Sequence, residues 1–88
     1  MSENKLQVDI ITPQKVIYSG EAESVTLPGS KSPFQVLINH APIVSSLDNG
    51  KVKVVETGGK SHSFSTTDGF AEVAKNKVSV LVESAEEV

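Results

Sequence analysis

The sequence contains no cysteine, and this absence removes several kinds of chemistry at once. Without cysteine there is no disulfide framework, no thiolate metal site and no thiol redox reaction. The fold must therefore be stabilised by packing alone. Its 88 residues suffice for one domain with a modest core and are too few for two ordinary domains.

Arginine is also missing, and aromatic residues are scarce. All eight basic residues are lysines, scattered along a chain of formal net charge −3 that has three phenylalanines and one tyrosine. Nucleic-acid binding usually relies on clustered cations, arginine forks or aromatic stacking platforms. We therefore expect no nucleic-acid partner.

Long hydrophobic runs are absent as well. No run approaches the roughly 20 apolar residues that cross a bilayer, and the polar residues 1–5 leave no signal-peptide core. The composition, 38% hydrophobic and 22% charged, is ordinary for a soluble globular protein. The default expectation is a chain that folds in the cytosol and does not span a membrane.

What the sequence does contain is a repeated alternation of apolar and polar residues, which is typical of half-buried β-strands. Turn-forming residues separate these segments at intervals of roughly 8 to 12 residues, the spacing of an antiparallel sandwich or barrel. The alternating apolar positions are Leu6, Val8, Ile10; Val25, Leu27; Phe34, Val36, Ile38; Val52, Val54; and Val78, Val80, Val82. The turn signals are Thr12-Pro13, Ser19-Gly20, Pro28-Gly29, Asp48-Asn49-Gly50, Gly58-Gly59, Asp68-Gly69 and Asn76.

Two glycine-containing dipeptides predict tight hairpins. Gly58-Gly59 lies between two strand-like segments, and consecutive positive φ values are cheap for glycine. We expect the same of Asn49-Gly50. No apolar stripe of helical period persists for ten residues, so no internal helix is predicted.

The C-terminal residues Ser84 to Glu87 fit a capping box, in which the Ser84 hydroxyl and the Glu87 carboxylate cap a helix start reciprocally. The pattern predicts that a helix begins at Ser84. Since the sequence stops at Val88, either a helical segment has been removed or the chain is a naturally short form with a vestige of one.

Catalytic and metal-binding patterns are missing. His40 and His62 have different surroundings and no carboxylate at a suggestive spacing, so neither a hydrolase nor a small enzyme of another kind is indicated. His62 is expected to face solvent on a hairpin arm. The segment Pro28 to Ser32 lacks the full phosphate-loop pattern and is interpreted as an exposed turn. We predict no catalytic, cofactor or metal site.

Five motifs in order nevertheless point to a family. They are Leu6 to Pro13, Tyr18-Ser19-Gly20, Glu23 to Gly29, Asn39-His40-Ala41-Pro42-Ile43, and Gly69 to Val73. With this set, the chain resembles the epsilon subunits of F-type rotary ATP synthases from Leu6 to Val88. Departures from the family pattern include Ser32-Pro33, Gln35, Ile38 and Asp68, so a contact through an acidic side chain in the 31–35 loop is not carried over.

The resemblance implies an all-β fold, a flattened antiparallel β-sandwich of about ten strands, with at most a helical turn at the C-terminus. It implies a sandwich domain over residues 1–83 and, over 84–88, the start of a missing or vestigial C-terminal helix. The family usually adds a helical hairpin there, so no nucleotide binding is expected without it. The chain would then carry no cofactor.

The function implied is that of a non-catalytic rotor subunit of the central stalk. Such a subunit binds gamma and the ring of c subunits, couples proton-driven rotation to ATP synthesis, and lies at the cytoplasmic face of the bacterial inner membrane, attached only through the complex. A stiff sandwich presenting loops to two partners suits the transmission of torque. The alternative is a free-standing ligand-binding or adhesion β-sandwich, for which the four aromatic residues are few.

Contacts are carried over position by position. His40 is expected to be partly exposed in the free domain and buried against gamma, although it could simply cap its turn through a backbone hydrogen bond. The gamma-facing residues implied are Thr12, His40, Ala41, Pro42, Ser45 and Thr67. The residues implied to face the c-ring are Gly29, Ser30, Lys31, Ser32, Pro33 and Phe34.

Overall fold

A computed structural model describes residues 5–88, so residues 1–4 of the expected domain lie outside the described range. This part of the chain is built from β-strands and has no helix, which confirms the all-β prediction. There are nine strands where about ten were expected. Their bounds are β1 Leu6–Ile11, β2 Val16–Leu27, β3 Phe34–Leu37, β4 Ile43–Leu47, β5 Gly50–Glu56, β6 Ser61–Thr66, β7 Gly69–Ala74, β8 Lys77–Val82 and β9 Ala85–Glu87.

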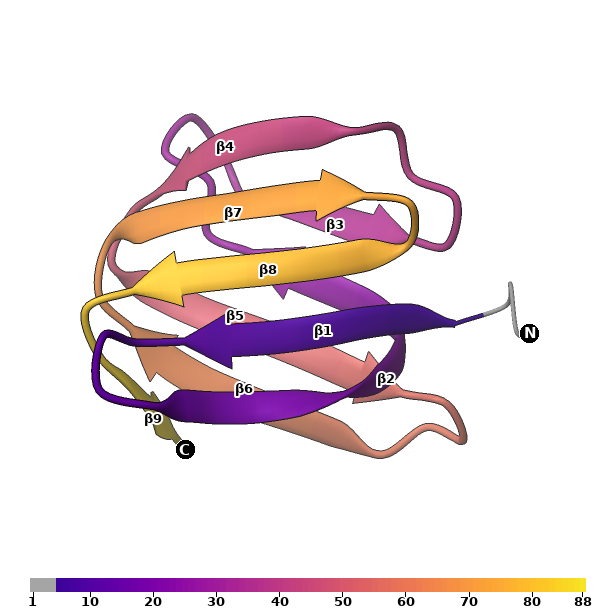
Figure 1. The fold of residues 1–88 in the computed structure, drawn as a ribbon, viewed down its shortest axis with the longest axis horizontal. Helices are drawn as coiled ribbons and strands as arrows, with labels where there is room; N and C mark the ends of the chain where they lie inside the picture. Colours follow the sequence, from indigo (N-terminus) through magenta and orange to yellow (C-terminus); the bar gives the residue numbers. More distant parts are fainter. Residues whose placement is uncertain (1–4) are drawn as a thin grey trace.

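The strands form one ladder that folds over into two layers (Figure 1). Its order is β4-β7-β8-β1-β2-β5-β6-β9, with β3 attached to β2. The layers share β2, a strand of 12 residues whose first half pairs with β1 and whose second half pairs with β3 and β5. The β1–β8 pair is parallel, an exception to the antiparallel arrangement expected throughout.

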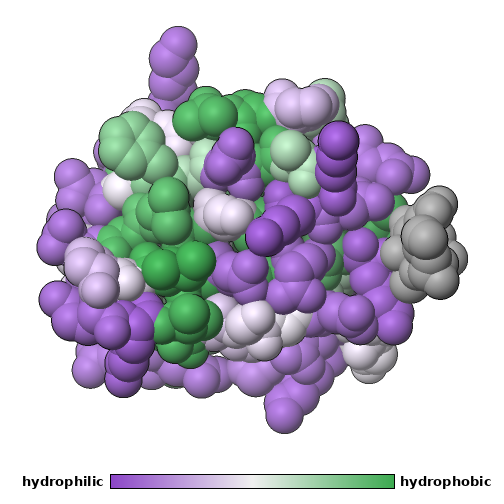
Figure 2. Space-filling view, viewed as in Figure 1, coloured by the Kyte–Doolittle hydropathy of each residue, from purple (hydrophilic) through white to green (hydrophobic). Residues whose placement is uncertain are grey.

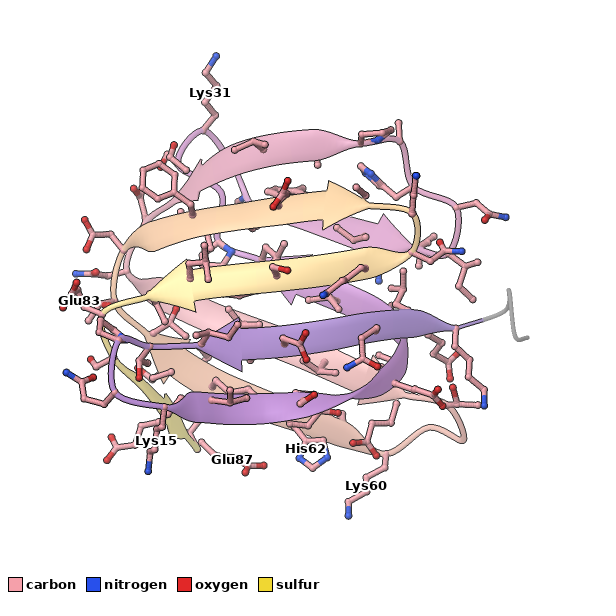
Figure 3. All side chains as sticks on the ribbon, in the orientation of Figure 1. Lys15, Lys31, Lys60, His62, Glu83 and Glu87 are labelled. Carbon is pink, nitrogen blue, oxygen red and sulfur yellow. The ribbon has the colours of Figure 1, made fainter. Side chains whose placement is uncertain are left out.

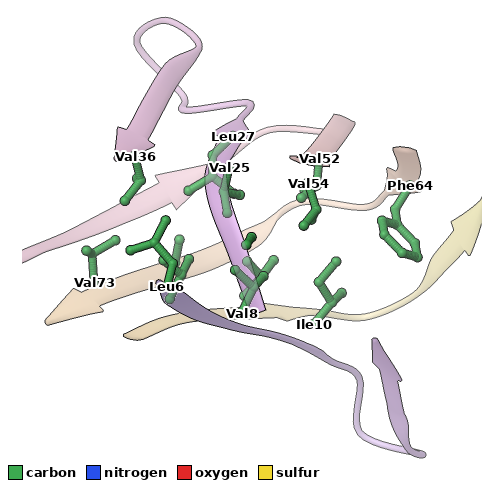
Figure 4. Packing of buried hydrophobic residues seen from close by; sticks show 14 of the residues in the cluster. Leu6, Val8, Ile10, Val25, Leu27, Val36, Val52, Val54, Phe64 and Val73 are labelled. Atoms are coloured by element: carbon green, nitrogen blue, oxygen red, sulfur yellow. The ribbon is translucent and has the colours of Figure 1, made fainter. Parts of the chain in front are cut away.

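The core lies between the layers and contains most of the predicted alternating positions (Figure 4). It also contains residues that were not predicted, and the predicted Phe34 and Ile38 are only partly buried; the additional residues are Ala22, Leu47, Phe64, Ala71 and Val73. Side chains of one parity point inward from each strand because successive residues in a strand face opposite sides. In β1 and β8, for example, Leu6, Val8 and Ile10 meet Val78 and Val80, all of which are fully buried. Within residues 5–88 every buried side-chain polar atom has a hydrogen-bond partner.

Of the two predicted hairpins, one is confirmed and one is wrong. Gly58 and Gly59 have φ values of 101° and 98° and connect β5 to its antiparallel neighbour β6. Asn49-Gly50 instead links β4 in one layer to β5 in the other, and these two strands do not pair. A local turn signal carries no information about which sheet the next strand joins.

Ser19-Gly20 is likewise not a turn, since it lies inside β2. Gly20 is needed there for space rather than for a bend. A Cβ at this position would lie 2.7 Å from the Tyr18 hydroxyl oxygen, because the tyrosine ring crosses over the glycine.

The predicted helix start at Ser84 is wrong, because Ala85–Glu87 forms strand β9. This strand pairs antiparallel with β6, with Phe64 opposite Glu87. The Val88 N–H donates to the Ser63 carbonyl (2.9 Å), and the Glu87 carboxylate contacts His62 instead of returning to Ser84. A helix of one turn would bury little, whereas the open edge of β6 offers a ready ladder. Among residues 5–88 we find no helix with the length and apolar character to span a bilayer.

Candidate functional site

The six residues implied to face gamma do not form one cluster. Thr12 and Thr67 lie at the end of the sandwich where β1 and β8 finish, whereas His40 to Pro42 lie at the opposite end, before β4. Ser45 is in the middle of β4. The set is therefore divided between two ends of the same layer.

The hydroxyl groups of Thr12 and Thr67 both form hydrogen bonds that stabilise connections between strands. Thr12 is 6% exposed, and its hydroxyl donates to the Lys15 carbonyl at 3.1 Å in the β1–β2 turn. The Thr67 hydroxyl accepts hydrogen bonds from the backbone N–H groups of Glu83 and Ser84, each at 3.1 Å, which ties the β6–β7 connection to the end of β8. Both hydroxyls are engaged within the chain.

The turn that contains His40 is held by asparagines rather than by the imidazole. The Asn39 N–H donates to the Asn76 side-chain oxygen at 2.6 Å, and the Asn76 amide donates back to the Asn39 side chain at 3.2 Å. Both residues have positive φ, 67° and 60°, a conformation that asparagine tolerates. His40 is partly exposed, with Nδ1 2.7 Å from the Ala41 carbonyl oxygen. Sequence reasoning missed the Asn39–Asn76 pair, which two turn asparagines could have suggested.

The loop from Gly29 to Phe34, the implied c-ring surface, is fixed at its base and open at its tip. The Ser30 N–H donates to the Ser46 carbonyl (3.1 Å) and the Asp48 N–H to the Pro28 carbonyl (2.8 Å). Lys31, Ser32 and Pro33 are exposed, and Lys31 points away from the sandwich (Figure 3).

An exposed apolar row crosses the outer face of this layer. Phe70 on β7 pairs with Leu81 on β8, Leu81 with Ile11 on β1, and Ile11 with Val16 on β2. Phe70, Leu81 and Val16 are 58%, 47% and 56% exposed. We call Val16, Ile11, Leu81 and Phe70 the outer apolar row, together with Val44 of β4 (71% exposed), which is opposite Glu72 in the neighbouring row and lies diagonally from Phe70.

The rest of this outer face is polar. The next row of paired positions holds Glu72, Ser79, Asp9 and Ser19, and Figure 2 shows hydrophilic side chains beside the hydrophobic ones. An open depression of about 310 Å³ lies at the end of the row between Thr12, Leu81 and Glu83. An exposed apolar band with a polar surround is typical of a protein-binding surface.

The outer apolar row was missed because its members stand at the parity that should face solvent. Ile11 follows Ile10, Leu81 stands between Val80 and Val82, and Phe70 precedes the buried Ala71. Apolar residues at these positions could have revealed the outer apolar row. A solvent-facing strand position that is apolar in several neighbouring strands predicts a partner rather than a core.

A polar cluster occupies the opposite edge of the ladder, around His62 on β6. Its ring contacts the Glu87 carboxylate of β9 through Nδ1 (2.7 Å) and the Glu56 carboxylate of β5 through Nε2 (3.0 Å). The Tyr18 hydroxyl donates to Glu56 at 2.6 Å, and the Tyr18 ring lies 5.3 Å from the imidazole. The His62 side chain is only 17% exposed, so its expected solvent-facing position is wrong. Figure 3 labels His62 and Glu87 near one another at this edge.

These contacts shift the pKa values in opposite directions. The hydrogen bond to Glu87, together with the charge of Glu56, raises the pKa of His62 despite some desolvation. The hydrogen bond from Tyr18, followed by the nearby His62, lowers the pKa of Glu56. Burial and the bond to Glu56 raise the pKa of Tyr18. The cluster is a set of charge-assisted contacts that link β2, β5, β6 and β9.

Comparison with known proteins identifies the fold and its family. The family model described as "ATP synthase, Delta/Epsilon chain, beta-sandwich domain" matches residues 5–88. The ATP synthase epsilon chain of Desulfosudis oleivorans is 44% identical over 86 residues, 98% of this chain and 64% of that protein. That of Chlorobaculum tepidum is 42% identical over 82 residues, 93% of each chain.

Solved structures agree on the fold. A chain from the Euglena gracilis mitochondrial ATP synthase, OSCP/F1/c-ring in rotational state 1, has a TM-score of 0.90 at 21% identity, covering 96% of this chain and 54% of that one. One from the Tetrahymena thermophila mitochondrial ATP synthase central stalk/c-ring has a TM-score of 0.75 at 19% identity, covering 98% and 69%.

The chain spans just under two thirds of the Desulfosudis relative and nearly all of the Chlorobaculum one. The match to the family model covers every residue that the structure describes. The chain belongs to the ATP synthase delta/epsilon chain family and forms the beta-sandwich domain of that family.

Proposed function

We propose that this chain is a non-catalytic rotor subunit of an F-type ATP synthase, which binds gamma and the c-ring and couples proton-driven rotation to ATP synthesis. Its relatives are named ATP synthase epsilon chains, and the similar solved chains come from F1/c-ring and central stalk/c-ring assemblies. In this role it lies at the cytoplasmic face of the bacterial inner membrane and reaches the membrane only through the complex.

The observation that carries the proposal is the outer apolar row. Two of its members are chain neighbours of residues that the family resemblance assigns to the gamma contact, since Ile11 precedes Thr12 and Val44 precedes Ser45. Burying such a row against a partner stabilises association by roughly 25 cal/mol for each Å² of apolar surface removed from water, before the costs of association. The row is therefore the centre of the gamma-binding surface in this proposal, and His40 to Pro42, at the other end of the layer, would form a separate part of the contact.

In the same proposal, the loop from Gly29 to Phe34 contacts the c-ring. The base of this loop is hydrogen-bonded to β4. A force on the exposed tip of the loop therefore passes directly into the layer that holds the outer apolar row. A loop anchored in this way transmits a push better than a free one would. The two contacts then lie on one rigid layer.

Co-expression with the gamma subunit of the same enzyme tests the function. A stable one-to-one complex is expected with the wild-type chain. Leu81→Lys places a charge in the outer apolar row and should weaken binding by about a hundredfold. Ser79→Lys is the matched control, because it adds the same charge to the same face of β8 in the polar row and should retain binding.

Two results would contradict the proposal. If a folded wild-type chain does not associate with gamma, the rotor role is wrong. If Leu81→Lys and Ser79→Lys bind equally well, the outer apolar row is not the contact.

A further inference from the structure

Strand β4 lies at one end of the ladder and pairs with β7 on one side only. In an antiparallel strand the N–H and C=O of one residue point to the same side, and the side alternates along the chain. The Ser46 carbonyl accepts from the Ser30 N–H, on the side away from β7. The backbone groups of Val44, two residues earlier, point to that same outer side, where nothing in residues 5–88 pairs with them.

This edge lacks the usual protection against strand pairing. Natural edge strands carry charges, prolines or bulges that keep other strands away. From Ile43 to Leu47 there is no charged residue, and Pro42 lies just before the strand. At the other end of the ladder, β9 carries Glu86 and Glu87 in only three residues.

A groove runs beside the open part of β4. It measures about 420 Å³ and lies between this strand and the loop that follows β2. Its walls combine the apolar side chains of Phe34, Ile43 and Val44 with serine hydroxyls such as that of Ser30. The loop already pairs with β4 at Leu47, so the far end of the groove is closed by a strand-like contact.

Such a site fits one kind of occupant, an extended peptide segment. Its backbone would exchange hydrogen bonds with Val44, and one uncharged side chain would enter the groove toward Phe34. Val44 also ends the outer apolar row, so a segment on the edge is continuous with a partner on the face.

We propose that β4 binds its partner by strand addition, in which a short extended segment of gamma pairs with the outer edge of β4 at Val44. The inference rests on the proposed function, because it assigns this edge to the gamma complex. Side-chain packing on the outer apolar row and backbone pairing on β4 then act together in one interface. The backbone pairing fixes the register of the partner.

Hydrogen exchange measured residue by residue in the isotope-labelled chain tests the pairing directly. In the free chain the Val44 amide should exchange fast and the Ser45 amide slowly, because only Ser45 points toward β7. Binding unlabelled gamma should slow exchange at Val44 by roughly tenfold or more. Unchanged exchange at Val44 in a formed complex would overturn strand addition.

Substitution at Val44 separates backbone pairing from side-chain packing. Val44→Pro removes the outward N–H without touching the bonds to β7, a position that edge strands tolerate, and should weaken gamma binding by about tenfold. Val44→Ala keeps the N–H and loses only apolar contact, so it should weaken binding severalfold less. Thermal unfolding checks that each variant is folded.

The outcomes distinguish the two proposals. If wild-type chain does not bind gamma, the proposed function fails. If wild type binds but Val44→Pro and Val44→Ala bind alike, gamma is still a partner and strand addition is wrong. If Val44→Pro does not fold, the exchange rate of the Val44 amide in the wild-type complex decides.

Discussion

Strands β3, β4 and β9 each pair with a single neighbour, and of these β4 and β9, at the two ends of the ladder, differ in the chemistry of their open sides. Strand β9 is short and acidic, and Glu87 is held by His62. Strand β4 is longer, carries no charge and exposes Ile43 and Val44. Negative charge and the Glu87–His62 ion pair disfavour the pairing of a further strand with β9, whereas β4 has neither feature and its edge can pair. In our proposal, this difference in edge chemistry separates a structural border of the sandwich, β9, from a docking border, β4.

The largest effect is expected from a matched pair of phenylalanines beside the two edges. Phe64 is opposite Glu87 of β9 and is 1% exposed, whereas Phe70 is opposite Ser46 of β4 and is 58% exposed. Phe64→Ala should lower the free energy of unfolding by about 3–5 kcal/mol through loss of core packing. Phe70→Ala should change it by no more than about 0.5 kcal/mol and weaken gamma binding about tenfold.

Chemical denaturation and gamma titration of both variants provide the measurement. The comparison fails if Phe70→Ala is as destabilising as Phe64→Ala, because Phe70 would then be part of the core rather than of a binding surface. It also fails if Phe64→Ala leaves stability unchanged.

The next effect is the pH dependence of the β9 edge. Because the contacts raise the pKa of His62, the folded chain holds its proton more tightly than the unfolded one. This stabilisation is complete below the unfolded pKa of about 6.5 and is lost as pH rises through the raised folded pKa. Thermal unfolding at increasing pH should show a falling midpoint in wild type and a flatter profile in His62→Gln.

Glu56 acts in the opposite direction. Its lowered pKa contributes stability above the unfolded carboxyl pKa of about 4.3, and this stability is lost as pH falls through the folded pKa of Glu56.

The control for His62→Gln is His40→Gln, because the His40 ring contacts its own neighbour Ala41 and, within residues 5–88, no carboxylate. A wild-type profile with no alkaline decline would show that His62 does not clamp β9.

Sequence predicted the interior of this fold better than its borders. Alternation located the core of β1 and β8 because burial imposes a period of two on every strand. It could not tell that Ala85–Glu87 pairs beside β6 instead of starting a helix, because the capping pattern is local and the competing strand pairing is not. For the same reason Asn49-Gly50 suggested a hairpin where the chain crosses between layers.

The candidate site was predicted only in part. The family resemblance pointed to Thr12, His40 and Ser45 and to the 29–34 loop, but none of these residues belongs to the outer apolar row, and His40 lies at the other end of the layer. Ile11, Leu81 and Phe70 become one feature only when the register aligns them across β1, β8 and β7. Register is a property of strand pairing, which a single sequence does not state.

The smallest effect concerns the free chain. Because the β4 edge is uncharged, concentrated solutions without gamma should show weak self-association through this edge. Val44→Lys adds an edge charge and should suppress it, whereas Glu86→Gln removes a charge from the β9 edge, whose strand is short, and should change it little. Sedimentation velocity over a range of concentrations provides the measurement. If Val44→Lys associates as much as wild type, the β4 edge is closed in the free chain, and its openness would have to arise when gamma binds.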